Sequence, residues 1–323
     1  MAGKKRSTLV AAWLAWLVHC GGSPASYVTA GGDDGGSRDA STPRTSDGGI
    51  GASGSSSGSS SGAGSGFYGP QNPGCKPLGT PRDPGMFPQT TFEPQPDYIP
   101  KNVIVITLDD VPDITWTAMD LQWLRANNLH VDVFVNTLNW GGPLSDVQQM
   151  FADGHYVGNH TVHHSYLVTL DAAAIESEIA GVESAVDMLT DAAVPHLTRF
   201  RAPYGEPYQP GCCTAAEQAL VELIVAKYAV AFAWNFDSGD TAGITNGTAL
   251  FNNVVMQIKT PGAPGAAWGI MLAHGVNQQT HDMLPLLLAY LKGNGFVLGN
   301  LEDVSCWMFG KHTWEIIPGR MPN

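Results

Sequence analysis

From Asn102 onward the chain alternates short apolar runs with longer segments of helical periodicity, and this alternation constrains its fold more than any other feature. Continuous apolar runs rich in valine and isoleucine are typical of strands buried on both faces of a parallel sheet. The predicted strands are Val103–Leu108, Val131–Asn136, Tyr156–Asn159, Thr198–Arg201, Val230–Phe236, Gly269–Ala273 and Phe296–Leu298. The predicted helices are Thr117–Asn127, Leu144–Ala152, Ala172–Thr190, Thr214–Lys227, Ala249–Lys259 and His281–Lys292. Strands that alternate with helices predict an α/β fold with a parallel sheet, either a barrel or doubly wound.

The segment Ala172–Thr190 shows the helical pattern most clearly. Its apolar residues at helical spacing are Ile175, Ile179, Val182, Val186 and Leu189. They predict one buried face, whereas Glu176, Glu178 and Glu183 fall on other faces of the helix.

The first 20 residues are predicted to be an export signal. Basic residues precede the apolar run Leu9–Val18, which is too short to span a bilayer core about 30 Å thick. Leu17, three residues before Cys20, makes the segment similar to a bacterial lipoprotein processing site, although His19 departs from the small residue typical there. We therefore expect export, with a lipid on Cys20 or with plain secretion as the alternative.

Residues 21–66 hold 14 glycines and 13 serines and are predicted to be a flexible linker. Residues 67–100 are rich in proline and are expected to form an extended lead-in to a folded domain at 101–323. After residue 66 the chain holds 11 basic and 25 acidic residues. This balance excludes a general nucleic-acid binder and disfavours docking on anionic lipid, so membrane contact is expected only through Cys20. We expect a monomer.

Four cysteines follow Cys20, an even number in an exported chain, which favours disulfides. Cys212 and Cys213 are adjacent, and a bridge between neighbours would be strained. We expect Cys75 and Cys306 each to be bridged, to one another or to another cysteine.

Polar side chains lie at the ends of five predicted strands. They are Asp109 and Asp110, then His160 with His163 and His164, then Arg201, then Asp237 and Asp240, and finally His274. Parallel α/β sheets place their functional sites at the carboxyl ends of strands, where the loops converge. Asp113, in contrast, is expected to cap the following helix.

The two histidines His160 and His164 are four residues apart, a spacing that lets two imidazoles face one ion, with His163 as a competitor at a spacing of three. One carboxylate and two imidazoles leave an open fourth position on zinc, which is the catalytic arrangement. Co²⁺, Mn²⁺ or Ni²⁺ suits the same ligands. In the pair Asp109–Asp110, one carboxylate can bind the metal while the other faces the metal-activated water.

Five ordered motifs together resemble those of the polysaccharide deacetylases, the NodB homology domain or carbohydrate esterase family 4. They are Thr107-Leu108-Asp109-Asp110, His160-Thr161-Val162-His163-His164, Arg201-Ala202-Pro203-Tyr204, Asp237-Ser238-Gly239-Asp240 and Leu272-Ala273-His274. The resemblance covers roughly residues 100–300. It implies a distorted (β/α) barrel of about seven parallel strands and the metal-dependent removal of N- or O-acetyl groups from sugars.

The resemblance also implies a role for each matching residue. Asp109 is the general base, His274 the general acid, and Asp110, His160 and His164 are the metal ligands. Arg201 holds the base, and Asp240 supports the acid or the arginine. The backbone N–H of Tyr204 helps to bind the oxyanion, while Leu272, Pro203 and Tyr204 match substrate-binding positions.

The chain departs from the family at Thr241, where a pocket-lining tryptophan is usual, and Trp234, Trp268 and Trp307 are candidates to replace it. The leading hypothesis is deacetylation of N-acetylglucosamine polymers such as chitin, its oligomers or peptidoglycan. The alternatives are an O-acetyl esterase acting on xylan and a non-catalytic glycan-binding surface protein of the same fold.

Overall fold

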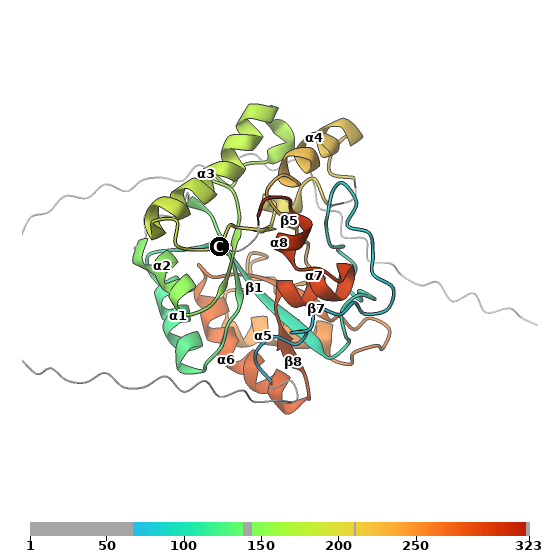
Figure 1. Cartoon of the computed structure of the whole chain (residues 1–323). Helices are drawn as coiled ribbons and strands as arrows, with labels where there is room; N and C mark the ends of the chain where they lie inside the picture. The colour runs from blue at the N-terminus through green and yellow to red at the C-terminus, as the bar shows by residue number, and fades with distance from the viewer. Residues whose placement is uncertain (1–66, 138–143, 210, 321–323) are drawn as a thin grey trace, which may run out of the picture. The chain divides into compact units, whose positions relative to one another are not determined.

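One parallel sheet forms the centre of the computed structural model, which describes residues 67–137, 144–209 and 211–320 (Figure 1). In this part of the chain the strands follow one another in the order β5-β4-β3-β2-β1-β7-β6, and β8 pairs with the beginning of β1. Their bounds are β1 Val103–Val111, β2 Asp132–Val135, β3 Tyr156–Asn159, β4 Arg199–Phe200, β5 Val230–Ala231, β6 Phe236–Asp237, β7 Gly269–His274 and β8 Val297–Gly299. The predicted barrel-like α/β fold is confirmed. The predicted export signal (1–20) and linker (21–66) lie outside the described residues.

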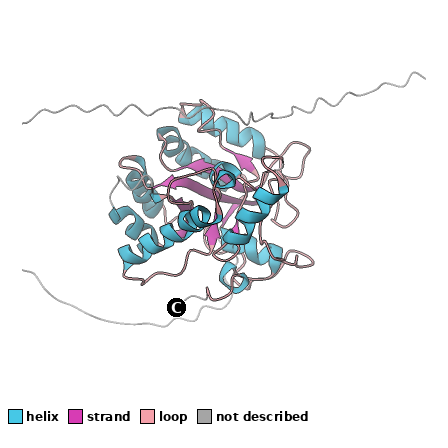
Figure 2. Ribbon diagram, turned by 90° about the horizontal axis from the view of Figure 1, so that it is seen from above, coloured by secondary structure: helices cyan, strands magenta, loops and turns pink. Residues whose placement is uncertain are grey.

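The helices surround this sheet, as the view along the perpendicular direction shows (Figure 2). They pack side by side in the order α4, α3, α2, α1, α6, α5, which follows the order of the strands they connect. Their bounds are α1 Trp116–Ala126, α2 Leu144–Ala152, α3 Ala172–Thr190, α4 Ala215–Val225, α5 Gly247–Ile258, α6 Gln278–Gly293, α7 Leu301–Phe309 and α8 Thr313–Ile316, with short 3₁₀ helices η2 Leu167–Thr169 and η3 Pro203–Gly205.

The central strand β1 is longer than predicted and includes Asp109 and Asp110. It pairs with β7 so that Asp109 lies opposite His274, which brings two of the predicted site residues to the same level. On the β2 side its register shifts between Leu108 and Val111. Such a shift re-aims side chains at the end of a strand. The side chain of Asp109 is buried here, while that of Asp110 is half-buried.

The predicted strand Val230–Phe236 is wrong as a single element, because the structure divides it into β5 and β6. The first half pairs with β4 and the second half with β7, at opposite ends of the strand order. Between them, Phe232 N–H donates to Phe200 O (2.8 Å) and Asn235 N–H donates to Ile270 O (2.8 Å). The chain must change partners within these few residues, so it cannot continue as one regular strand, and it links the two edges of the sheet.

Helix α7 was not predicted from the sequence. All nine of its residues are buried, so it has no exposed face and no amphipathic pattern. Its ends do carry signals: Asn300 and Asp303 form a capping box, and Gly310 ends the helix with φ 67°. Helix α8 is a single short turn that was also not predicted.

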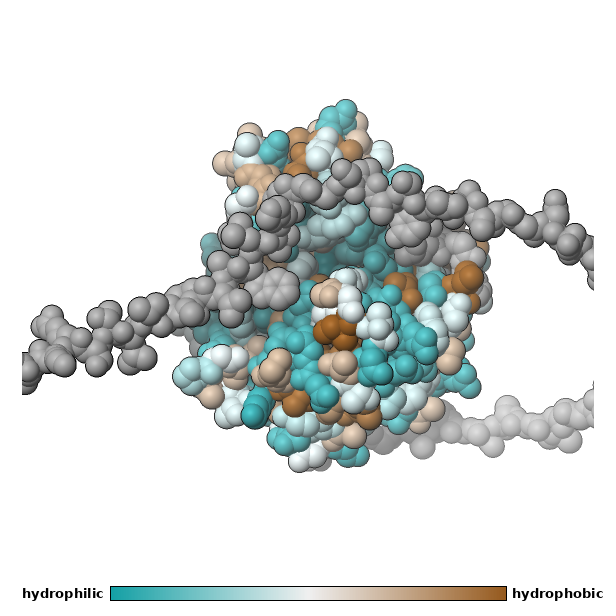
Figure 3. Space-filling model, turned by 180° about the vertical axis from the view of Figure 1, so that it is seen from behind, coloured by the Kyte–Doolittle hydropathy of each residue, from teal (hydrophilic) through white to brown (hydrophobic). Residues whose placement is uncertain are grey.

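The surface seen from behind carries hydrophobic residues in small groups among hydrophilic ones (Figure 3). Within the described ranges, no helix combines the length and the apolar character needed to cross a membrane.

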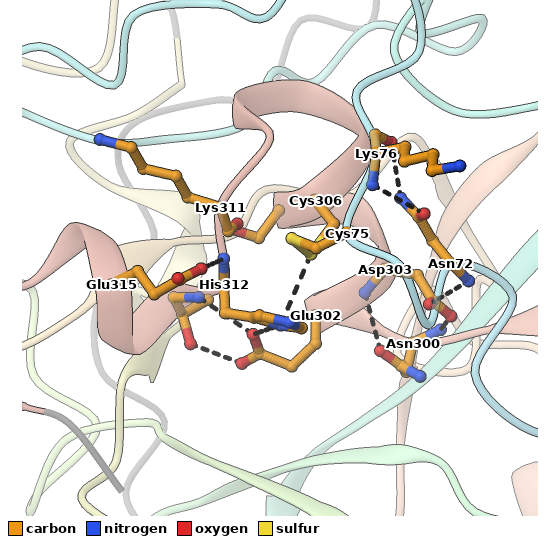
Figure 4. The surroundings of a disulfide bond; sticks show 12 residues. Asn72, Cys75, Lys76, Asn300, Glu302, Asp303, Cys306, Lys311, His312 and Glu315 are labelled. Atoms are coloured by element: carbon orange, nitrogen blue, oxygen red, sulfur yellow. Dashed lines mark hydrogen bonds and ion pairs between the residues drawn. A yellow bond between two sulfur atoms is a disulfide. The ribbon is translucent and has the colours of Figure 1, made fainter.

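The lead-in follows the folded core closely. Gln89 forms an isolated parallel bridge with Ala231 of β5, which covers an edge of the sheet. A disulfide joins Cys75 of the lead-in to Cys306 of α7, and Asp303 accepts hydrogen bonds from the backbone N–H groups of Gln71 and Asn72 (Figure 4). The expected bridging of Cys75 and Cys306 is thus found, and it is between these two cysteines.

Cys212 and Cys213 are free thiols, with their sulfur atoms 3.2 Å apart.

Candidate active site

The structure brings three of the predicted site residues to one point at the carboxyl ends of β1 and β3. Asp110 Oδ1 lies 3.5 Å from His160 Nε2 and 3.4 Å from His164 Nε2. The potential ligand atoms all lie within 4.8 Å of one another. Four tetrahedral ligands about 2.0–2.1 Å from a zinc ion are separated by about 3.3–3.4 Å. The two Asp110 distances are therefore those of ligands that share one small cation.

Both imidazoles can offer a ring nitrogen to a metal. His160 Nδ1 lies 2.8 Å from the carbonyl oxygen of Arg201, so Nδ1 carries the proton and donates it, which leaves Nε2 as the ligand atom. Burial, reinforced by the neighbouring His160, lowers the pKa of His164 to about 4 and keeps its ring neutral. The donor set thus fits a divalent metal such as zinc, cobalt, manganese or nickel.

His163, the competing ligand, is not part of this group. Its side chain is 67% exposed, and its Nδ1 lies 2.8 Å from Glu178 Oε1. Glu178 also accepts from His163 N–H (2.8 Å) and Ser165 Oγ (3.2 Å). Glu178 lies on one of the faces of α3 that the apolar pattern leaves out, yet it is buried, because it fixes the loop that presents His160 and His164. The sequence could not indicate this role, because a glutamate on the polar side of a helix normally faces solvent.

The second carboxylate of the pair is held by a buried arginine. Arg201 Nη1 donates to Asp109 Oδ1 (2.9 Å) and to the Thr107 hydroxyl, and its Nε donates to Phe232 O (3.1 Å). Arg201 and Asp109 are 1% and 2% exposed. The other oxygen of Asp109, Oδ2, lies 3.8 Å from His160 Nε2, so the carboxylate reaches the edge of the potential metal site.

His274 at the end of β7 is paired with Asp240. Asp240 Oδ1 lies 2.9 Å from His274 Nδ1, and Oδ2 accepts from His274 N–H (2.7 Å) and from the Thr280 hydroxyl (2.7 Å). Burial alone would lower the pKa of His274, but the hydrogen bond and charge of Asp240, helped by Asp109 and Asp110, raise this pKa to about 9. The imidazole is therefore held in its charged form, with Nδ1 donating to Asp240.

Several site residues adopt the left-handed backbone conformation that favours glycine. They are Asp110 (φ 66°), Thr161 (φ 69°), His164 (φ 54°) and Tyr204 (φ 59°). Strained backbone of this kind persists where the surrounding structure demands it and is frequent at functional sites.

The predicted substrate-binding residues lie beside these groups. Pro203 and Leu272 are buried, and Tyr204 is 44% exposed, with its ring packed edge-on against His164 at 4.6 Å. Of the tryptophans proposed to replace the one missing at Thr241, Trp268 and Trp307 are core residues, and Trp268 Nε1 donates to Pro96 O and Ile99 O.

Trp234 lies beside Arg201 of the site. Its ring is 5.9 Å from the guanidinium of Arg201, and a Cβ on Gly205 would come within 2.8 Å of it.

Two polar residues at strand ends take other roles. Asn136, which was not singled out because it does not titrate, donates to Asp110 Oδ1 (3.0 Å). It directly follows β2, so the strand-end rule that selected the other residues identifies it as well. Asp237 accepts from Gly239 N–H (2.8 Å), and Asp113 caps α1 as predicted, by accepting from the N–H groups of Trp116 and Thr117.

A cavity of about 610 Å³ lies elsewhere, beside the amino-terminal ends of β3 and β4. Its lining includes His155, Arg199, Glu302 and Trp314 but none of the predicted site residues. Size alone does not make it the functional site, because the carboxylates, imidazoles and arginine described above converge at the other ends of the strands.

Comparison with known proteins identifies the family. The family model for polysaccharide deacetylases matches residues 98–224. A chitin deacetylase of Colletotrichum lindemuthianum is 30% identical over 200 residues, which cover 60% of this chain and 75% of the relative. A peptidoglycan-N-acetylglucosamine deacetylase of Bacillus cereus is 28% identical over 166 residues, 50% of this chain and 58% of the relative. Another relative, a chitin deacetylase of Pestalotiopsis, is 38% identical over 106 residues, 32% of this chain and only 34% of its own length.

Solved structures share the fold. The chitin deacetylase of Colletotrichum lindemuthianum aligns with a TM-score of 0.54 at 24% identity, over 69% of this chain and 96% of that one. A family 4 carbohydrate esterase of Streptomyces lividans, solved with acetate, aligns with a TM-score of 0.50 at 26% identity, over 62% and 94%. A pseudoenzyme of family 4 has the same fold, with a TM-score of 0.50 at 17% identity, so the fold alone does not establish turnover. From its sequence and its fold, the chain belongs to the polysaccharide deacetylase family.

Proposed function

We propose that the protein hydrolyses acetyl groups from N-acetylglucosamine-containing glycans such as chitin, chitooligosaccharides or peptidoglycan, in a reaction that depends on a divalent metal. The observation that carries this proposal is that three kinds of chemical group converge: potential metal ligands, a carboxylate and a charged imidazole. A ligand set (Asp110, His160, His164), a carboxylate fixed by Arg201 and an imidazolium fixed by Asp240 lie at the carboxyl ends of β1, β3 and β7.

Asp110, His160 and His164 would hold the cation, which when bound would polarise the acetyl carbonyl and lower the pKa of a water molecule. Asp109 accepts the proton of the attacking water, since its Oδ2 faces the ligand set while Arg201 holds Oδ1. Arg201 keeps this carboxylate in one orientation without taking part in proton transfer.

The leaving nitrogen needs a proton, because an amide anion is a very poor leaving group. His274 donates this proton from Nε2 as the carbon–nitrogen bond breaks, since Nδ1 is engaged by Asp240. The backbone N–H of Tyr204 stabilises the negative oxygen of the tetrahedral intermediate, and the loss of one such donor typically costs about 10²–10³ in rate.

The decisive experiment measures acetate released from chitooligosaccharides, peptidoglycan and acetylated xylan by the full chain supplied with Zn²⁺, Co²⁺, Mn²⁺ or Ni²⁺. We expect release from the N-acetylated glycans that stops with a chelator and in Asp109→Asn. Release from acetylated xylan alone would instead establish the O-acetyl esterase, an alternative favoured by the likeness to the Streptomyces lividans esterase. Binding of glycan without any release at full metal occupancy would establish a non-catalytic protein.

Export, with or without a lipid on Cys20, is part of the proposal, because such polymers lie outside the cytoplasm. Mass spectrometry of the mature amino terminus tests it, and a start at any residue other than Cys20 contradicts lipid attachment.

A further inference from the structure

A row of aromatic rings leads away from the potential metal site. The ring of His164 lies 4.9 Å from that of His160 and 4.6 Å from that of Tyr204, both in edge-to-face contact. Tyr204 in turn is stacked on Tyr166, with centroids 3.8 Å apart and planes only 6° from parallel. Tyr166 is thus the last ring of a continuous wall that starts at the metal ligands.

The aromatic side chain of Tyr166 is exposed to solvent. Its side chain is 45% exposed, although a tyrosine gains most from burial of its ring. Two exposed tyrosines stacked in parallel present a flat apolar surface beside the reaction centre. Flat aromatic faces with polar surroundings are suited to hold the apolar face of a sugar ring, much as they hold the face of a nucleic-acid base.

The backbone around Tyr166 is fixed. The Thr169 N–H (3.0 Å) and hydroxyl (2.7 Å) both donate to Tyr166 O. On the other side, Ser165 Oγ donates to Glu178, and the next residue, Leu167, is 1% exposed in the core. A ring on a fixed backbone that is also stacked on Tyr204 loses little freedom when it binds a ligand, which favours binding.

We propose that the outer face of Tyr166 binds a pyranose ring of the glycan, next to the sugar whose acetyl group lies at the metal. This rests on the proposed function and deepens it, because it makes the enzyme bind chains of two or more sugars more tightly than a single sugar. Two ring-to-ring steps, of 4.6 Å and 3.8 Å, separate Tyr166 from His164, so a sugar on the outer face of Tyr166 lies apart from the sugar at the metal. Tyr166 acts on substrate binding and takes no part in proton transfer.

The test compares Tyr166→Ala with wild type on N-acetylglucosamine, its dimer and its tetramer, and on 4-nitrophenyl acetate. We expect KM for the tetramer to rise about tenfold in Tyr166→Ala, with kcat nearly unchanged. Activity on the monosaccharide and on the small ester is expected to stay at the wild-type value. Tyr166→Phe keeps the ring and is expected to restore KM for the tetramer.

A matched control removes a stacked ring at the other end of the barrel. Trp314 is stacked on His312 at 4.2 Å, next to Thr313, whose hydroxyl contacts that of Thr198 just before β4. Trp314→Ala is expected to leave every kinetic constant unchanged. The proposal is overturned if Tyr166→Ala lowers activity on monosaccharide and tetramer by the same factor, as a purely structural role would, or if it changes neither.

A binding experiment tests this sugar subsite independently of whether the protein releases acetate. Calorimetry measures tetramer binding to Asp109→Asn and to Asp109→Asn combined with Tyr166→Ala. A tenfold weaker affinity in the double variant supports the subsite even if the wild type releases no acetate, whereas equal affinities contradict it.

Discussion

Two arginines at the ends of one short strand form buried ion pairs with very different surroundings. At the carboxyl end of β4, Arg201 binds Asp109, and at the amino-terminal end Arg199 binds Glu302 of α7. Both oxygens of Glu302 are engaged within the protein, by Arg199, Thr313 and His312. Asp109 instead keeps Oδ2 directed toward the histidine ligands. The same pair of residue types therefore joins α7 to the sheet at one end and orients the proposed base at the other.

The comparison predicts that the largest loss of activity comes from Asp109. Asp109→Asn keeps an oxygen for Arg201 but cannot accept a proton, so we expect kcat to fall by about 10²–10⁴. Acetate release at saturating substrate measures this. Glu302→Gln is the matched control, since it also neutralises a carboxylate beside an arginine, and its kcat per folded molecule should equal that of the wild type. Equal losses in the two variants would contradict the division of roles.

The same comparison predicts the largest loss of stability at the other end. Glu302→Ala leaves the Arg199 charge buried and unpaired, and such a change typically lowers the free energy of unfolding by about 3–5 kcal/mol. Urea denaturation followed by circular dichroism measures it. An unchanged unfolding midpoint would show that the pair does not stabilise α7 against the sheet.

Replacing each of the two arginines by lysine tests the same difference between the two ion pairs. Lysine cannot reproduce the several hydrogen bonds of either guanidinium. Arg201→Lys should lower kcat about 10²-fold through misplacement of Asp109, because small errors in the position of a catalytic group are costly. Arg199→Lys should lower stability and leave kcat of the folded protein unchanged. A larger kcat effect in Arg199→Lys would reverse our assignment.

The smallest expected effect is a shift in pH dependence. Deprotonation of His274 removes the general acid, and its raised pKa keeps it charged up to about 9. Asp240→Asn removes the main groups that raise this pKa, so the alkaline limb of the kcat profile should move down toward the ordinary histidine value near 6.5. Wild type and variant are compared with the same metal over a range of pH. A limb that stays in place would exclude His274 as the titrating acid.

Much of the candidate site could be predicted from the sequence, because parallel strands bring residues at their carboxyl ends together regardless of loop length. Asp110, His160 and His164 needed only this rule and their spacing. Glu178 and Tyr166 could not be predicted, since their roles depend on how the loop after β3 folds back on α3. The buried helix α7 lacked periodicity, and the change of partner between β5 and β6 depends on sheet closure, which no local pattern encodes.

The central claim is that Asp110, His160 and His164 together bind one cation, and metal binding tests it most directly. Metal content by mass spectrometry and Zn²⁺ titration by calorimetry are measured for wild type, His160→Ala, His164→Ala and His163→Ala. We predict one ion per chain in wild type and in His163→Ala, and a loss of at least tenfold in affinity in the other two. Loss of the ion in His163→Ala, or full retention in His164→Ala, would contradict the account.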